Sequence, residues 1–113
     1  MMLPQENSCR VTDNSVALQL TLTPELFWFK GHFPEQAILP GVTQLHFVMH
    51  YAKTLLHIDL PFKGMDVVKF QRPLFPGESL ELTIIWDQES HKLSFEYTCG
   101  GTVASSGRIT LCQ

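Results

Sequence analysis

Charged residues are scarce in this chain of 113 residues. Lys and Arg number 8 and Asp and Glu 11, so charged residues make up 17% of the chain against 44% hydrophobic residues, and the formal net charge is −3. A small soluble monomer usually carries more polar cover than this. We therefore expect apolar surface to be buried in a homodimer or a higher even oligomer, with a heterodimer formed with a related chain as the alternative. The absence of any Lys/Arg cluster argues against a nucleic-acid partner.

Cysteine pairs and long apolar runs are also lacking. Cys9, Cys99 and Cys112 are odd in number and widely spaced, with no CxxC pair, which favours free thiols in a reducing cytoplasm. No apolar run reaches membrane-spanning length. Residues 1–12 are polar, which argues against a signal peptide and predicts a loosely ordered lead-in. We expect a cytoplasmic protein that does not enter the membrane.

Hydrophobic periodicity predicts one helix among several strands. Alternating apolar residues indicate half-buried strands over residues 16–22, 80–86 and 93–99. Residues 62–70, with Val67 and Val68 at their centre, and residues 103–111 are predicted to be strands as well. From Gly41 to about Ile58 the period becomes that of a helix. Gly100-Gly101 supplies the positive φ that a tight hairpin needs. One strand, one helix and a run of antiparallel strands form an α+β fold, which we expect to fill a single domain over residues 1–113.

The predicted helix is apolar over most of its circumference. At roughly 100° per residue, the polar side chains form one narrow stripe, which contains Thr43, His46, His50, Lys53, Thr54 and His57. Such a helix is expected to be buried and wrapped by the sheet. The spacing of His46 and His50 could suit zinc, but a third ligand and an HExxH pattern are lacking, so we predict no metal site.

A turn-rich segment leads into this helix. Pro34 and Pro40 each fix φ and remove a backbone donor, which excludes regular helix or a central strand there. Pro40-Gly41 then opens the helix, where unpaired N–H groups and a partial positive charge are expected. A histidine such as His32, held on a loop beside that helix start, suits proton transfer next to a developing oxyanion. The segment therefore predicts a catalytic site.

Two motifs carry a family resemblance. Residues 31–34 (GHFP) and 39–42 (LPGV) form the first, and residues 68–80 (VKFQRPLFPGESL) the second. The chain resembles the hotdog-fold 3-hydroxyacyl-[acyl carrier protein] dehydratases, and most of all the branch associated with aryl polyene biosynthesis. The resemblance implies an antiparallel sheet wrapped around one long central helix. It also implies pairing with a second hotdog subunit into a continuous sheet, with active sites at the subunit interface.

The resemblance also implies roles for single residues. His32 would take the α-proton of an acyl thioester carried by acyl carrier protein, and the N–H of Gly41 would receive the thioester carbonyl oxygen. Phe33, Pro40 and Val42 would complete the substrate-binding residues. The family keeps a carboxylate fourteen positions after its histidine, where this chain has His46. That residue would meet the departing hydroxyl. No cofactor is implied.

Two other functions compete with dehydration. A hotdog thioesterase commonly uses a helix carboxylate to activate water, but no Asp or Glu occurs between Glu35 and Asp59. A non-catalytic subunit that binds acyl chains, or that completes the interface of another dehydratase, is the second alternative. Lys63, Lys69 and Arg72 could meet an acidic carrier protein.

Overall fold

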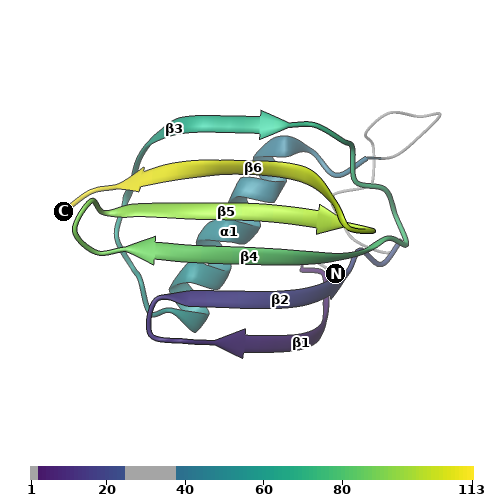
Figure 1. Cartoon of the computed structure of the whole chain (residues 1–113), viewed down its shortest axis with the longest axis horizontal. Coiled ribbons are helices and arrows are strands. Elements are labelled where there is room, and N and C mark those ends of the chain that lie inside the picture. The colour runs from purple at the N-terminus through teal and green to yellow at the C-terminus, as the bar shows by residue number, and fades with distance from the viewer. Residues whose placement is uncertain (1–2, 25–37) are drawn as a thin grey trace.

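The computed structural model describes residues 3–24 and 38–113, which form one antiparallel sheet and one helix. The sheet has six strands in the order β1-β2-β4-β5-β6-β3, and helix α1 (Gly41–Leu55) lies across one of its faces (Figure 1). The strands are β1 (Gln5–Val11), β2 (Ser15–Thr21), β3 (Phe62–Phe70), β4 (Ser79–Asp87), β5 (Lys92–Cys99) and β6 (Thr102–Leu111). This arrangement confirms the expected α+β hotdog fold.

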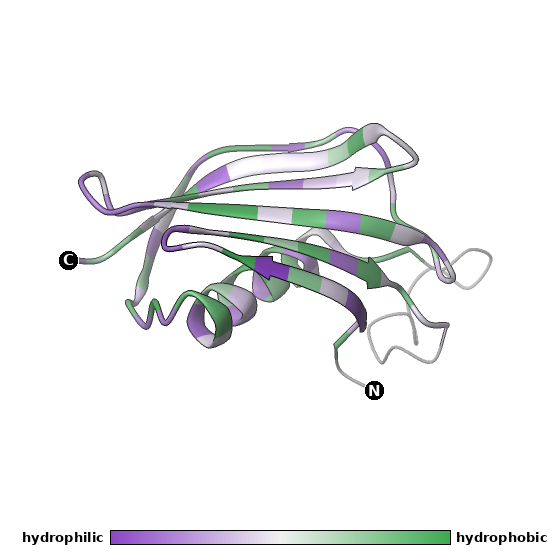
Figure 2. Cartoon of the chain, turned by 60° about the horizontal axis from the view of Figure 1, so that its bottom comes forward, coloured by the Kyte–Doolittle hydropathy of each residue, from purple (hydrophilic) through white to green (hydrophobic). Residues whose placement is uncertain are grey.

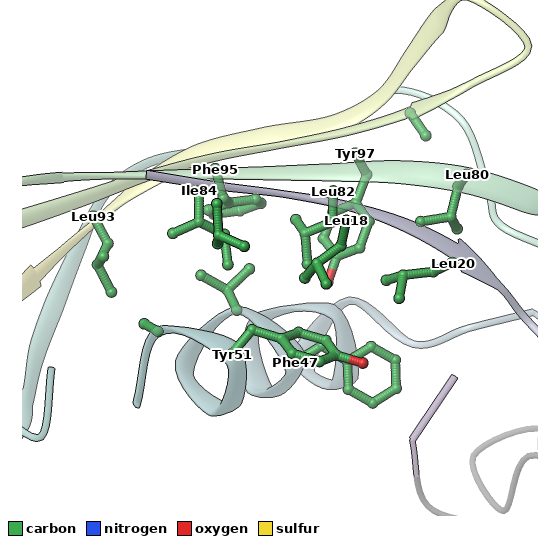
Figure 3. Close-up of a cluster of buried hydrophobic side chains, with 14 of the residues drawn as sticks. Leu18, Leu20, Phe47, Tyr51, Leu80, Leu82, Ile84, Leu93, Phe95 and Tyr97 are labelled. Atoms are coloured by element: carbon green, nitrogen blue, oxygen red, sulfur yellow. The ribbon is translucent and has the colours of Figure 1, made fainter. Parts of the chain in front are cut away.

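The core lies between the sheet and α1. Alternation along the strands turns every second side chain to the helix, so that β2, β4 and β5 present matched apolar rows. Leu18 stands opposite Leu82, and Ile84 stands opposite Phe95. Figure 3 shows these side chains pointing from the sheet towards Phe47 on α1. Burial of this interface is the main source of stability, because each fully buried Leu, Ile or Phe contributes about 1.5–3 kcal/mol.

Helix α1 packs on the sheet with one side only. Figure 2 shows the sheet above the helix and no second layer below it among the residues described. The helical side chains that are buried are Thr43, Gln44, Phe47, Val48, Tyr51 and Ala52. Val42, in contrast, is 76% exposed. In a single chain the sheet therefore covers one side of the helix, which leaves Val42 exposed, and Thr43 belongs to the buried face instead of the polar stripe.

Two element boundaries differ from the sequence prediction. The lead-in expected over residues 1–12 contains strand β1, which pairs antiparallel with β2. All seven residues of β1 are exposed, so the strand has no apolar alternation and only backbone pairing reveals it. The helix ends at Leu55 instead of near Ile58, because His57 takes a left-handed φ of 58°. The hairpin predicted at Gly100-Gly101 is confirmed by φ values of 59° and 78°.

Strand β3 forms one edge of the sheet. It pairs with β6 alone, and its other edge carries backbone groups without a strand partner in the described chain. Four large apolar side chains are about half exposed along it, namely Phe62, Met65, Val67 and Phe70. An exposed apolar edge strand is a template for pairing with another chain.

Candidate active site

The start of α1 carries two backbone donors without a partner in the described chain. Pro40 precedes the helix with φ −60° and ψ 148°, and its carbonyl accepts the N–H groups of Thr43 and Gln44 at 3.1 Å each. The N–H groups of Gly41 and Val42 come before these and find no acceptor within residues 3–24 and 38–113. The first turn holds no acidic side chain. This end of α1 therefore keeps the partial positive charge of a helix N-terminus.

A cavity of about 410 Å³ opens beside this helix start. Its walls come from three segments: the residues before α1, the first turn of α1, and the end of β3 with the chain that follows it. The lining residues are Ile38, Leu39, Gly41, Gln44, Phe70, Gln71, Arg72 and Pro73. A cavity of this size, mostly apolar and bearing a few polar groups, suits a small acyl group.

Gly41 and Phe70 form a close contact at the wall of this cavity. A Cβ atom placed on Gly41 would stand 2.7 Å from Cζ of Phe70, and 3.0 Å from its Cε1. Phe70 itself is 53% exposed at the end of β3. A side chain at position 41 would require the Phe70 ring to move. The constraint is steric only, because the φ of Gly41 is helical and other residues could adopt it.

A buried polar cluster lies directly behind the helix start. Gln44 is 3% exposed, and its side-chain nitrogen donates to the carbonyl of Leu39 at 3.3 Å. Its side-chain oxygen accepts the hydroxyl of Ser105 at 2.7 Å. The hydroxyl of Tyr97 donates to the backbone carbonyl of Gln44 at 2.6 Å. Burial holds the pKa of Tyr97 well above its ordinary value, so the phenol remains a donor.

Sequence patterns alone do not predict this cluster. The available signal was a glutamine in the first turn of a helix, outside the polar stripe and one turn before the apolar residues Phe47 and Val48. A buried amide requires partners, but nothing in the pattern indicated which residues of the sheet would supply them.

An ion pair holds the turn after β3, which contributes Arg72 to the lining of the cavity. Arg72 donates through its two terminal guanidinium nitrogens, Nη1 and Nη2, to the two carboxylate oxygens of Glu78. Glu78 also accepts the N–H of Phe75 at 2.8 Å and the thiol of Cys99 at 3.3 Å. The hydrogen bond from Arg72 lowers the pKa of Glu78 below its ordinary value. Because Arg72 is paired with Glu78, its charge stabilises this turn and is less available to an acidic carrier protein than the charge of an unpaired side chain would be.

The predicted site residues fall into three groups. His32 and Phe33 lie outside the described residues. Pro40 and Gly41 stand at the helix start, and Gly41 faces the 410 Å³ cavity. Val42 and His46 lie on the exposed side of α1, one turn apart.

His46 lines a second cavity of about 250 Å³, which shares no lining residue with the first cavity. Met49, His50, Lys53, Ile58, Asp59 and Leu60 complete its lining. His46 lies five positions after Gly41, which places the two about 140° apart around the helix axis. A single chain therefore does not bring Gly41 and His46 to one cavity.

The described residues show neither a metal-binding cluster nor a membrane-spanning helix. Within residues 3–24 and 38–113, no group of three His, Cys, Asp or Glu side chains could hold a metal ion. Over the same residues, no helix has the length and apolar character needed to cross a membrane.

The family profile described as ApeI-like, ApeI dehydratase, matches residues 8–108 of the chain. The chain belongs to this family. As an ApeI-like dehydratase, it combines the helix-start cavity described above with a histidine at position 46. The resemblance read from the two sequence motifs is thereby confirmed.

The similarity of this ApeI-like chain extends to named relatives. It is 29% identical over 109 residues to the 3-hydroxyacyl-[acyl-carrier-protein] dehydratase FabZ of Koribacter versatilis, covering 87% of this chain and 69% of the relative. It is 31% identical over 99 residues to FabZ of Sorangium cellulosum, covering 73% of this chain and 61% of the relative. The chain thus spans between about three fifths and seven tenths of these two dehydratases.

One solved structure resembles the ApeI-like chain over almost its full length. It is the dehydratase heterocomplex ApeI:P from Xenorhabdus doucetiae, which is 46% identical with a TM-score of 0.94. The alignment covers 99% of this chain and 100% of the chain in that structure. Sequence and fold therefore lead to the same family.

Proposed function

We propose that this dehydratase converts 3-hydroxyacyl thioesters, carried by acyl carrier protein, to trans-2-enoyl thioesters in fatty acid or aryl polyene synthesis. The observation that carries the proposal is the N–H of Gly41, which lacks an acceptor in the described chain at the start of α1 and lies in the wall of a 410 Å³ cavity. A backbone donor at the positive end of a helix stabilises negative charge that develops on a carbonyl oxygen. The FabZ relatives carry this reaction in their name.

The proposed elimination needs one base and one oxyanion donor. His32 takes the proton from the α-carbon, and the electron pair of that C–H bond moves towards the thioester carbonyl, whose oxygen is held by Gly41. The bond between the β-carbon and the hydroxyl oxygen then breaks as the double bond forms. His32 returns its proton to the departing oxygen, so one water molecule leaves. His46 donates a hydrogen bond to that hydroxyl or orients a water, and no cofactor takes part.

We further propose that two chains complete each site. Gly41 and His46 open on different cavities of one chain, so a substrate held at Gly41 needs a second chain to supply His46. The exposed apolar edge of β3 offers the surface for joining two sheets, and the bare side of α1 around Val42 would then face the partner. A homodimer or a higher even oligomer meets this requirement.

A heterodimer with a related hotdog subunit is the alternative assembly. It is supported by the Xenorhabdus doucetiae structure, which is a heterocomplex. In such an assembly this chain could also act as a non-catalytic, acyl-binding partner, and His46 at the carboxylate position is the observation that favours this second function. Thioesterase activity has no such support, because α1 contains no Asp or Glu.

The compartment follows from thiol chemistry. Cys9, Cys99 and Cys112 are all free, and free thiols persist where the surroundings are reducing. We propose a cytoplasmic location on this ground.

The decisive experiment incubates the purified protein with 3-hydroxyacyl-[acyl carrier protein] and follows enoyl formation and free thiol together. Dehydration without thiol release is the expected result. His32→Ala should abolish enoyl formation while the circular dichroism spectrum stays unchanged. Thiol release without enoyl product would establish a thioesterase. Activity only after co-expression with a hotdog partner, and unaffected by His32→Ala in this chain, would establish the non-catalytic role.

A further inference from the structure

We infer that Gln44 is a positioning residue, which holds the Leu39–Pro40 peptide so that the N–H of Gly41 points into the cavity. The inference rests on the proposed function, because it takes Gly41 to be the oxyanion donor. Gln44 itself would not touch the reacting atoms. It would act through the backbone immediately before the helix.

The hydrogen bonds define which way the Gln44 amide points. The carbonyl of Leu39 can only accept a hydrogen bond, so the group facing it at 3.3 Å must be the amide nitrogen. This leaves the amide oxygen for the hydroxyl of Ser105, which donates at 2.7 Å from β6. Ser105 is fully buried, so neither partner can exchange its bond for one to bulk water. The amide is therefore fixed at both ends.

The segment before the helix is held from two sides. The N–H of Leu39 donates to the carbonyl of Leu74 at 2.8 Å, while the carbonyl of Leu39 accepts from Gln44. The side chain of Leu39 is also buried. Pro40 follows with a fixed φ and no N–H of its own. The direction of the Gly41 N–H then depends on ψ of Pro40, which stands at 148°, and on the two backbone hydrogen bonds that the Pro40 carbonyl accepts from the first turn of α1. Loss of the hydrogen bond from the Gln44 side chain would allow the Leu39–Pro40 peptide to move, and the Gly41 N–H would change direction with it.

Gln44→Met tests the idea with a side chain of similar length and no donor. Because the removal of an oxyanion donor costs about 10²–10³ in kcat, its misdirection should lower kcat about ten- to a hundredfold. KM should change by less than about threefold, since the lining of the cavity stays largely apolar. Ser105→Ala leaves the bond to Leu39 but releases the other end of the amide, so a smaller loss is expected.

Gln44→Glu adds a readout that a purely structural role would not give. The carboxylate cannot donate to the carbonyl of Leu39, whereas the protonated acid can donate to it and still accept from Ser105. The rate of this variant divided by that of the wild type should therefore rise as the pH falls. Taking the ratio removes the pH dependence that both proteins share.

Tyr97→Phe is the matched control. It removes a buried hydrogen bond of 2.6 Å in the same cluster, but that bond ends on the backbone carbonyl of Gln44 and leaves its side chain untouched. Figure 3 shows Tyr97 pointing from β5 towards α1. A comparable loss of stability with kcat within about twofold of wild type is expected, because the amide still holds Leu39.

Infrared spectroscopy separates this inference from the proposed function. The probe is an acyl thioester without the 3-hydroxyl group, ¹³C-labelled at the carbonyl and bound to the assembled protein. Wild type and Tyr97→Phe should lower its carbonyl stretch relative to free thioester, and Gln44→Met should return it towards the free value. If wild type produces no lowering, the oxyanion role of Gly41 is wrong.

If wild type lowers the stretch and Gln44→Met keeps both the lowering and kcat, the positioning role of Gln44 is overturned. If Gln44→Met fails to fold, the variants Gln44→Glu and Ser105→Ala test the positioning role of Gln44 instead. A flat rate ratio across pH for Gln44→Glu, together with an unchanged kcat for Ser105→Ala, would overturn the inference equally.

Discussion

The ring of Phe70 closes over Gly41 so tightly that a Cβ on the glycine would stand 2.7 Å from the ring carbon Cζ. One residue ends the edge strand β3 and the other begins α1, so this contact joins the part of the sheet that we expect to meet a partner with the proposed oxyanion donor. The wall of the cavity therefore depends on the absence of a side chain at position 41.

Gly41→Ala should reduce the rate of dehydration about tenfold or more without unfolding the protein. Alanine favours a helix over glycine by about 1 kcal/mol, which offsets part of the clash, but its Cβ must push the Phe70 ring or the helix start aside. The double variant with Phe70→Leu should recover part of the loss, as measured by kcat across the four proteins.

Gly64→Ala is the control, because a Cβ at that position has no atom within 4 Å. It should leave the rate unchanged. Full activity in Gly41→Ala would show that the contact with Phe70 has no role in the site.

His46 is expected to act as a hydrogen-bond donor to the substrate hydroxyl. Its imidazole ring always offers at least one N–H. His46→Asn keeps a donor and should retain substantial activity, whereas His46→Leu should lose about a hundredfold. Steady-state rates of both variants decide. If His46→Asn and His46→Leu are equally inactive, a simple hydrogen-bond donor is not sufficient and the imidazole itself is required. If both variants are as active as wild type, His46 only lines the pocket.

Complementation tests whether two chains share each site. His32→Ala and His46→Leu should each be nearly inactive as homodimers. After exchange of subunits at equal concentration, half of the dimers are mixed and each has one intact site, so about a quarter of the wild-type rate should appear. No activity after verified subunit exchange would show that His32 and His46 act within the same chain.

The edge of β3 should control assembly. Val67, 49% exposed near the middle of β3, would be buried if two such edges joined. Val67→Lys would place a charge there, and the dissociation constant measured by light scattering should rise at least about a hundredfold. Ile85→Lys is the matched control, because Ile85 is similarly exposed but lies on the interior strand β4. If Val67→Lys has the same dissociation constant as wild type, the interface does not lie along the edge of β3.

Acid should weaken the turn after β3, which contributes Arg72 to the lining of the cavity. The pKa of Glu78 is lowered in the folded state, chiefly by the hydrogen bond from Arg72. The folded state therefore holds this proton less tightly than the unfolded state does. The stabilisation is fully present above the ordinary glutamate pKa of about 4.3 and is lost as the pH falls through the lower, folded value.

The difference in unfolding free energy between wild type and Glu78→Gln, measured by denaturant titration, should consequently be largest near neutral pH and shrink in acid. Glu89→Gln, at an exposed turn, is the control. A difference between wild type and Glu78→Gln that does not change with pH would contradict the role of the ion pair.

Local sequence patterns were sufficient for most of the fold. Alternation and helical periodicity depend on neighbours along the chain, so they identified five strands and α1, and the motif around Pro40 and Gly41 located the helix start. Strand β1 was missed because an edge strand with exposed side chains leaves no apolar pattern. The family resemblance came from the same local motifs and holds over residues 8–108.

What the sequence alone could not determine was which distant residues meet. Ser105 lies 61 positions from Gln44, and Phe70 reaches Gly41 only because β3 joins the sheet beside β6. Likewise, one-sided packing of α1, which buries Thr43 and exposes Val42, depends on how the sheet approaches the helix. Periodicity gives the direction of a side chain about its own helix or strand axis, but the order and register of the strands decide what that side chain touches.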